Sequence, residues 1–173
     1  TLGNITLNNV NPTHLSIVMQ KLEQAGCRIH VDGNSISIEK CDRLEAVDMT
    51  TDVYPGFPTD LQAQWIALMS VAKGSSIITD TIYHDRFSHV PELVRLGANI
   101  SLENNVVVVR GVEKLKGAQV MSTDIRASAS LVIAALMAEG RTDISRIYHI
   151  DRGYERIEEK FQSLGADIYR ENE

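Results

Sequence analysis

Two aspartates and three arginines occupy positions from which they could bind an anion and move a proton. Asp60 and Asp124 each lie at the start of an expected apolar helix, and Arg126 lies in the first turn of the second one. Arg86 and Arg152 each follow the strand that comes after such a helix. A helix N-terminus carries about half a positive charge and free N–H groups, and a guanidinium binds planar oxyanions through paired hydrogen bonds. The pattern predicts a phosphate or carboxylate site.

Each of these residues also has a simpler interpretation. An aspartate at a helix start is more often a cap than a base, by roughly two to one on capping preference alone. Arg86 and Arg152 each adjoin an aspartate and could be solvated loop charges. Residue types alone therefore predict an end of the molecule that attracts anions, and they do not name a reaction.

The composition argues against several classes of function. The chain has 173 residues, of which 43% are hydrophobic, and a net charge of -6, without the basic excess that nonspecific nucleic-acid binding needs. Cys27 and Cys41 fit no metal spacing and indicate reduced thiols, and the histidines have no ligand-like spacing either. No segment approaches the ~18 apolar residues of a membrane span. We expect a cytoplasmic protein with no metal, no cofactor, no nucleic-acid partner and no membrane contact.

The hydrophobic pattern predicts the elements that hold these residues. Five helices are expected. The first covers 12–25, the second runs from Thr59, which forms a capping box with Gln62, to about Gly74, and the fourth contains the apolar run 131–138. The third and fifth are amphipathic, with apolar sides formed by Val90, Leu93 and Val94 and by Tyr154, Ile157, Phe161 and Leu164. Expected strands and hairpins cover 5–7, 27–40, 45–51, 76–82, 99–109, 118–122 and 142–148, with a third hairpin at 166–173.

An internal repeat links these elements. The segments KLEQAGCRIHV, ELVRLGANISL and KFQSLGADIYR align, and their glycines recur about every seventy residues, which predicts a β-α-β-α-β-β unit. Within a unit the first helix is apolar all round and the second is amphipathic. First helices should therefore pack together in the centre, with strands outside, and their N-termini should meet at one end. By the same symmetry Arg86 and Arg152 should lie near one another. An incomplete first unit should leave an exposed apolar gap.

At these residues the chain resembles the enolpyruvyl transferases, and among them the branch that acts on UDP-N-acetylglucosamine. The most specific segments are YPGFPTDLQAQ (54–64), TDIRASASLV (123–132) and RIYHIDRGYERIEEK (146–160). The resemblance implies an α/β fold, the inside-out α/β barrel of repeated βαβαββ units, with helices buried and sheets outside. The chain would be a single domain of this kind over 1–173, with an incomplete first repeat and repeats at about 1–41, 42–111 and 112–173.

The resemblance also implies a reaction, the transfer of the enolpyruvyl group of phosphoenolpyruvate to the 3′-hydroxyl of UDP-N-acetylglucosamine with release of phosphate. This is a step of peptidoglycan synthesis, so the implied setting is cell wall biogenesis, cell shape, the cell cycle and cell division. Asp60 is similar to the family's aspartate that binds the sugar hydroxyl and acts as general base. Ile82 matches a position whose backbone contacts the UDP-sugar.

The anion-binding residues follow from the same resemblance. Arg126 and Arg152 look like the arginines that hold the carboxylate and phosphate of phosphoenolpyruvate, and Arg86 and Asp124 match polar residues of the same cleft. The family's other domain, N-terminal and catalytic, has no counterpart here, so the chain alone is expected to lack turnover. Two alternatives stay open: a binding-only module that docks a partner through the apolar gap, and a nucleic-acid enzyme of the related RNA phosphate cyclase architecture.

Overall fold

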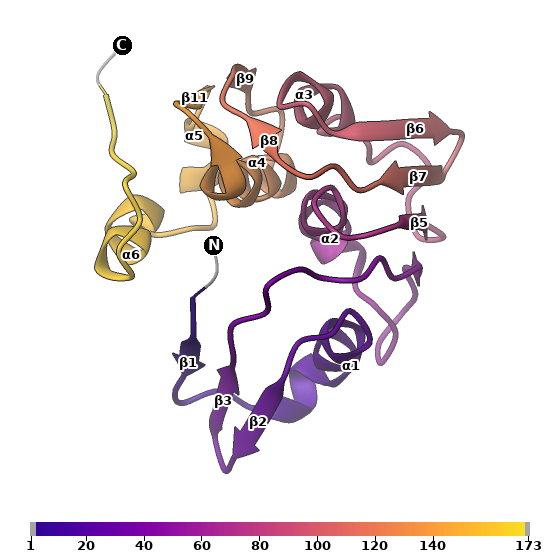
Figure 1. Cartoon of the computed structure of the whole chain (residues 1–173), viewed down its shortest axis with the longest axis vertical. Coiled ribbons are helices and arrows are strands. Elements are labelled where there is room, and N and C mark those ends of the chain that lie inside the picture. Colours follow the sequence, from indigo (N-terminus) through magenta and orange to yellow (C-terminus); the bar gives the residue numbers. More distant parts are fainter. Residues whose placement is uncertain (1–2, 172–173) are drawn as a thin grey trace.

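Residues 3–171 are described by a computed structural model, and they form a mixed α/β structure in which helices pack against small sheets (Figure 1). The strands form four separate sheets, one of three, two of two and one of four strands. These helices and sheets confirm the expected α/β class. Cys27 and Cys41 are both free thiols.

The largest sheet belongs to the middle of the chain and has the strand order β4-β5-β7-β6. Its strands are β4 (Met49–Thr50), β5 (Ser75–Thr79), β6 (Asn99–Glu103) and β7 (Val106–Arg110). β4 pairs parallel with β5, and the other pairs are antiparallel. The helices between them are α2 (Gln62–Met69), entered through the 3-10 turn η2 (Thr59–Leu61), and α3 (Val90–Arg95). Residues 49–110 thus follow the β-α-β-α-β-β order.

The C-terminal part is built around one long helix, α4 (Ile125–Met137). It is flanked by two parallel pairs, β9 (Gln119–Met121) with β11 (Asp143–Ser145) and β8 (Leu115–Lys116) with β10 (Ala138–Glu139). The short helices α5 (Tyr148–Asp151) and α6 (Ile157–Ser163) follow.

The N-terminal part is a three-stranded antiparallel sheet with one helix. The sheet has the order β1-β3-β2, and the elements are β1 (Ile5–Leu7), η1 (Pro12–Leu15), α1 (Ser16–Gln24), β2 (Ile29–Asp32) and β3 (Ser35–Ile38). Asn11 caps η1, and its side chain accepts the N–H of Thr13 at 3.1 Å. Gly33 turns the hairpin with φ +54°, as the Asp-Gly pair predicts.

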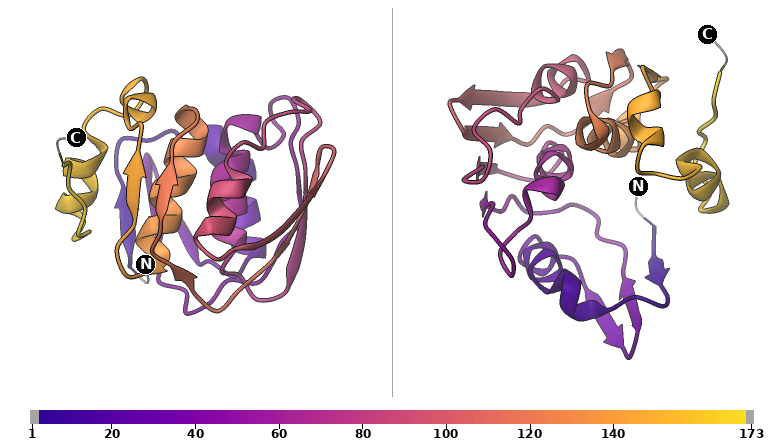
Figure 2. Two further views of the ribbon diagram at one scale, coloured as in Figure 1. Left: turned by 90° about the horizontal axis from the view of Figure 1, so that it is seen from above. Right: turned by 180° about the vertical axis from the view of Figure 1, so that it is seen from behind.

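Two central helices hold the core together. α2 and α4 lie side by side in all three views, and the four-stranded sheet covers α2 on its outer side (Figures 1 and 2). Ile66 and Ala67 of α2 and Leu131 and Ala134 of α4 are fully buried. No residue of α1 is fully buried, so α1 covers the core from outside. Both central helices are first helices of their predicted units, which agrees with the predicted layering.

Several predicted boundaries are wrong for identifiable reasons. α2 ends at Met69, well before Gly74, because the N–H of Lys73 turns away to the carbonyl of Leu44 at 2.7 Å. The capping box at Thr59 does not form: the Thr59 hydroxyl is turned toward Asp80, to which it donates at 2.7 Å, and its oxygen accepts Arg86 Nη1 at 2.9 Å instead of a helix N–H. The side chain of Gln62, its predicted partner, is buried without a hydrogen bond.

Two further expectations concern α3 and the C-terminus. Val94 is 46% exposed, because Glu92 takes the buried position and its carboxylate accepts the N–H of Met121 at 2.9 Å. The third hairpin is not seen: residues 166–171 are in neither helix nor strand, and residues 172–173 lie outside the described residues. The described strands close no barrel, and α2 and α4 are the only central helices within residues 3–171.

Candidate functional site

Asp60 lies at the centre of a charged cluster where α2 and α4 begin. Its Oδ1 accepts a hydrogen bond from Arg126 Nε at 2.5 Å and another from Arg86 Nη1 at 3.2 Å. The Asp60 side chain is 65% exposed, whereas those of Arg86 and Arg126 are mostly covered. Within residues 3–171, Asp60 Oδ2 accepts no hydrogen bond. One carboxylate oxygen is therefore fixed by two guanidinium groups and the other is open to a ligand.

Asp124 caps α4 and so positions Arg126. Its Oδ1 accepts the N–H groups of Arg126 and Ala127 at 2.8 and 3.1 Å, and its Oδ2 accepts the hydroxyl of Ser88 at 3.2 Å. Burial alone would raise the pKa of Asp124, but the hydrogen bonds from the N–H groups of Ala127 and Arg126 and from the Ser88 hydroxyl outweigh it and lower the pKa. Asp124 therefore stays ionised, and its role here is that of a cap.

Arg86 is held from two further sides. Its Nη1 donates to the hydroxyl of Thr59 at 2.9 Å, and its guanidinium carbon lies 3.7 Å from the centre of the Tyr83 ring. Stacking on an aromatic face and a fixed hydrogen bond both limit the rotation of a guanidinium. Arg86 is thus oriented before any ligand binds.

Asp80 is the residue that the sequence analysis missed. It directly follows β5, is fully buried, and accepts four hydrogen bonds, two from distant threonines and two from the backbone that follows it. The donors are the hydroxyls of Thr51 and Thr59 at 2.8 and 2.7 Å and the N–H groups of Ile82 and Tyr83, both at 2.9 Å. Burial opposes ionisation of Asp80, but these donors outweigh it and lower the pKa.

Ile82 and Arg152 are the two remaining residues of the predicted site. The N–H of Ile82 is committed to Asp80, so only the carbonyl of Ile82 is left for a ligand. Arg152 is exposed and, among the described residues, forms no ion pair. The next residue, Gly153, lies so close to Ile125 that a Cβ would be 2.3 Å from Ile125 Cδ1, which holds Arg152 beside the first turn of α4. No hydrogen bond within residues 3–171 joins Arg152 to Arg86, so their predicted proximity stays a prediction.

His89 follows Ser88, which bonds Asp124, and is only 2% exposed. Its Nε2 is buried without a hydrogen-bond partner in the described residues. Burial lowers the pKa of His89 to about 4, although Asp124 acts in the opposite direction. His89 is therefore neutral in the folded chain at neutral pH.

This neutral histidine predicts acid sensitivity. Between pH 6.5 and about pH 4 the unfolded chain binds a proton at His89 that the folded chain does not bind. The free energy of unfolding should therefore fall as the pH falls through this window, by up to about 3 kcal/mol. Urea denaturation of the purified chain at several pH values measures this slope. His89→Gln should flatten it; a slope in His89→Gln equal to that of the wild type would contradict the assignment.

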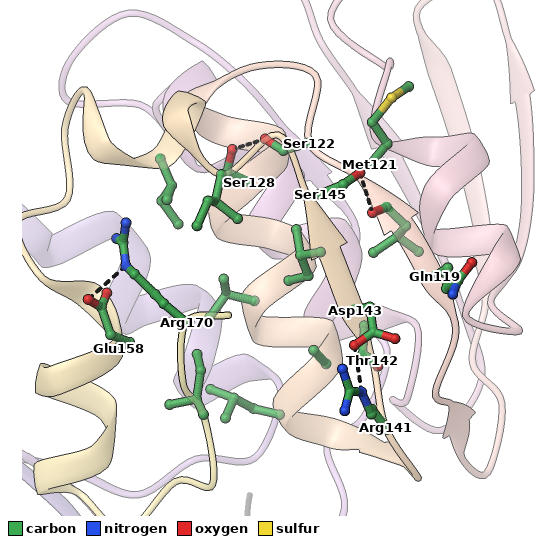
Figure 3. Close-up of a pocket in the computed structure, with 18 of the residues that line it drawn as sticks. Gln119, Met121, Ser122, Ser128, Arg141, Thr142, Asp143, Ser145, Glu158 and Arg170 are labelled. Atoms are coloured by element: carbon green, nitrogen blue, oxygen red, sulfur yellow. Dashed lines mark hydrogen bonds and ion pairs between the residues drawn. The ribbon is translucent and has the colours of Figure 1, made fainter. Parts of the chain in front are cut away.

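A separate cleft of about 990 Å³ runs along the other side of α4 (Figure 3). It is lined by Val132 and Leu136 of α4, by β9 and β11, and by residues 167–171. Its charged groups pair with one another: Arg170 with Glu158 at 2.7 Å and Arg141 with Asp143 at 2.6 Å. None of the six predicted site residues lines it, and it does not border the incomplete first unit, where the sequence analysis expects an apolar gap. Size alone therefore does not mark the functional site.

Residues 3–171 contain neither a metal-binding cluster nor a membrane-spanning helix. No group of three or more histidine, cysteine, aspartate or glutamate side chains is arranged to hold a metal ion. No helix in the described part of the chain has the length and the apolar character needed to cross a membrane.

Comparison with known proteins gives a consistent family. A family model for EPSP synthase (3-phosphoshikimate 1-carboxyvinyltransferase) matches residues 1–161. Proteins named UDP-N-acetylglucosamine 1-carboxyvinyltransferase are 55% identical over 172 residues in Prosthecochloris aestuarii and 54% identical over 169 residues in Myxococcus xanthus. These matches cover 99% and 98% of the chain but 40% of each relative. The chain thus spans about 40% of the length of the curated relatives it matches.

Solved structures agree with this grouping. The enolpyruvyl transferase NikO from Streptomyces tendae superposes with a TM-score of 0.81 at 30% identity, over 88% of this chain and 36% of that one. EPSP synthase from Acinetobacter baumannii superposes with a TM-score of 0.74 over 98% of this chain and 40% of that one. Its 18% identity supports the fold alone.

Proposed function

The chain belongs to the EPSP synthase family of enolpyruvyl transferases, and we propose that it forms part of an enzyme that transfers the enolpyruvyl group of phosphoenolpyruvate to the 3′-hydroxyl of UDP-N-acetylglucosamine. The main observation behind this proposal is the geometry of the Asp60 carboxylate: Arg86 and Arg126 both donate to Oδ1, and Oδ2 is free to bind a ligand. The choice of sugar nucleotide rests on the curated relatives, which share this substrate in their names.

The roles in this proposal are those that the family resemblance implies, and the geometry supports them. A general base must reach the proton it removes, and Asp60 Oδ2 is the free oxygen of a carboxylate whose orientation is already set. In the reaction the sugar 3′-oxygen bonds to C2 of phosphoenolpyruvate while C3 gains a proton; elimination then breaks the C2–O bond to phosphate and C3 loses a proton. Asp60 takes the proton of the 3′-hydroxyl in the first step.

The arginines supply the complementary charge. Arg126 uses only Nε on Asp60, so among the described residues its two Nη groups are open to an oxyanion. Arg152, exposed beside the first turn of α4, adds a second guanidinium for the carboxylate or phosphate of phosphoenolpyruvate. The carbonyl of Ile82 contacts the UDP-sugar, and Arg86 and Asp124 keep Asp60 and Arg126 in place.

The remaining parts of the proposal concern the whole protein. We propose that α2, α4 and a third central helix outside this chain build the inside-out α/β barrel, with repeats at about 1–41, 42–111 and 112–173. An N-terminal catalytic domain supplies the other half of the site. The enzyme acts in the cytoplasm in peptidoglycan synthesis and so serves cell wall biogenesis, cell shape, the cell cycle and cell division.

Phosphate release tests this function. The full-length protein should release phosphate from phosphoenolpyruvate when UDP-N-acetylglucosamine is present, and shikimate 3-phosphate should not replace the sugar nucleotide. The purified 173-residue chain should release none, because the proposed site is shared with residues outside it. Turnover with shikimate 3-phosphate would reject the substrate, and turnover by the purified chain would reject the shared site.

A further inference from the structure

Asp80 and Thr59 form a chain of hydrogen bonds, here called the relay, that runs from the buried Asp80 through the half-buried Thr59 to the charged cluster around Asp60. The Thr59 hydroxyl donates to Asp80 Oδ2 at 2.7 Å, and its oxygen, Thr59 Oγ1, accepts a hydrogen bond from Arg86 Nη1 at 2.9 Å. Arg86 Nη1 then reaches Asp60 Oδ1 at 3.2 Å. The direction is fixed, because an ionised Asp80 can only accept and a guanidinium can only donate.

The second oxygen of Asp80 holds the other support of Arg86. Oδ1 accepts the N–H groups of Ile82 and Tyr83, both at 2.9 Å, and this turn presents the Tyr83 ring to the Arg86 guanidinium. The main chain of Asp80 is fixed as well, since its N–H and carbonyl both pair with Asn105 at 3.0 Å. Asp80 is therefore hydrogen-bonded to both supports of Arg86, the Thr59 hydroxyl and the Tyr83 backbone, without a hydrogen bond to Arg86 itself.

We propose that Asp80, acting through Thr59, is a positioning residue that orients Arg86 and thereby the Asp60 carboxylate for the transfer reaction. A hydroxyl that donates to a carboxylate becomes a stronger acceptor, so an ionised Asp80 strengthens the hold of Thr59 on Arg86. With asparagine at position 80 the amide nitrogen or oxygen must face Thr59, and the four donors lose one acceptor. The inference rests on the proposed function for its kinetic part only.

The chain offers a matched control. Thr51 is fully buried and also donates its hydroxyl to Asp80, at 2.8 Å, but in residues 3–171 its hydroxyl accepts the N–H of Thr81, at 3.0 Å, and forms no hydrogen bond with Arg86. Thr51→Val and Thr59→Val each remove one hydrogen bond to Asp80, and only Thr59→Val breaks the relay. Thr59→Ser keeps the hydroxyl and should restore it.

The kinetic test compares these variants in the full-length protein at equal folded fraction. Thr59→Val and Asp80→Asn should lower kcat by about 10- to 100-fold and change KM for UDP-N-acetylglucosamine by less than about threefold, because the relay acts on orientation. Thr51→Val and Thr59→Ser should stay within about threefold of wild type in kcat. Equal losses in Thr51→Val and Thr59→Val would overturn the proposal, since Asp80 would then be structural only. If Asp80→Asn does not fold, the threonine pair decides alone.

A spectroscopic readout needs no turnover and separates this inference from the proposed function. In NMR spectra the Arg86 side-chain protons should show an upfield shift from the Tyr83 ring in wild type and Thr51→Val. The shift should fall by more than half in Thr59→Val and be recovered in Thr59→Ser. An unchanged shift in Thr59→Val would overturn the relay even in an active enzyme. A wild-type protein that keeps the shift but does not turn over would overturn the proposed function and leave the relay standing.

Discussion

Replacing Asp60 by asparagine should lower kcat of the full-length protein by roughly 10²- to 10⁴-fold, the range expected for loss of a general base. The amide keeps the size of the side chain, but it cannot take a proton from a sugar hydroxyl. Folding should be little affected, because the Asp60 side chain is 65% exposed and its partners also have other contacts. Steady-state phosphate release with UDP-N-acetylglucosamine measures the loss.

A distant aspartate provides the control for this substitution. Asp42 is 96% exposed and pairs only with Lys40 among the described residues. Asp42→Asn should therefore leave kcat unchanged. If Asp60→Asn retained more than about a third of the wild-type kcat, Asp60 would not be the base, and the carboxylate would serve only to pair with the arginines.

Replacing Arg126 by alanine should reduce kcat/KM by roughly 10²- to 10³-fold, comparable to the loss of one preorganised donor to a developing anion. Arg126 has two roles in the account, since Nε fixes Asp60 at 2.5 Å and the Nη groups face the ligand. Arg126→Lys should recover little, because an ammonium cannot bind Asp60 and an oxyanion in one plane.

The cap of α4 separates these effects from misfolding. Asp124 binds the backbone N–H of Arg126, so the helix start does not depend on the guanidinium. Circular dichroism of Arg126→Ala should match wild type. Arg28→Ala, which removes an exposed arginine paired with Glu39, is the charge-matched control and should keep kcat/KM. A loss in Arg126→Ala no greater than in Arg28→Ala would contradict the anion-binding role.

The sequence predicts the central helices and the charged cluster for the same physical reason. A helix that is apolar all round must be buried, and repeated units place the first turns of such helices together. The contact between Asp60 of one unit and Arg126 of the next follows from that symmetry. Arg152 and Arg86 are equivalent positions of two repeats, but the sequence does not predict in which direction the exposed side chain of Arg152 points after the short helix α5.

Asp80 was not predictable from spacing. Its four donors come from residues 51, 59, 82 and 83, which the fold brings together around one carboxylate. The only local signal is an aspartate directly after a strand and before TIY, where it can accept the next backbone N–H groups. The same residue helps to explain the failed capping box, because the Thr59 hydroxyl is turned toward the buried Asp80 carboxylate and its oxygen accepts Arg86 Nη1 in place of a helix N–H.

The ends of the short strands could not be predicted for a different reason. β4 and β8 have two residues each, so their hydrophobic alternation is too brief to fix their ends. The exposure of Val94 in α3 could not be predicted either. Glu92 is buried in its place and accepts a backbone N–H from β9, and no local sequence pattern indicates this long-range hydrogen bond.

A crystal structure of the full-length protein with UDP-N-acetylglucosamine bound tests the central claim most directly. The account predicts the sugar 3′-hydroxyl within hydrogen-bond distance of Asp60 Oδ2, with the uridine side of the ligand passing the carbonyl of Ile82. It also predicts that the cleft between α4, β9 and β11 holds no sugar nucleotide. A ligand bound in that cleft, with Asp60 still paired only to Arg86 and Arg126, would contradict the account.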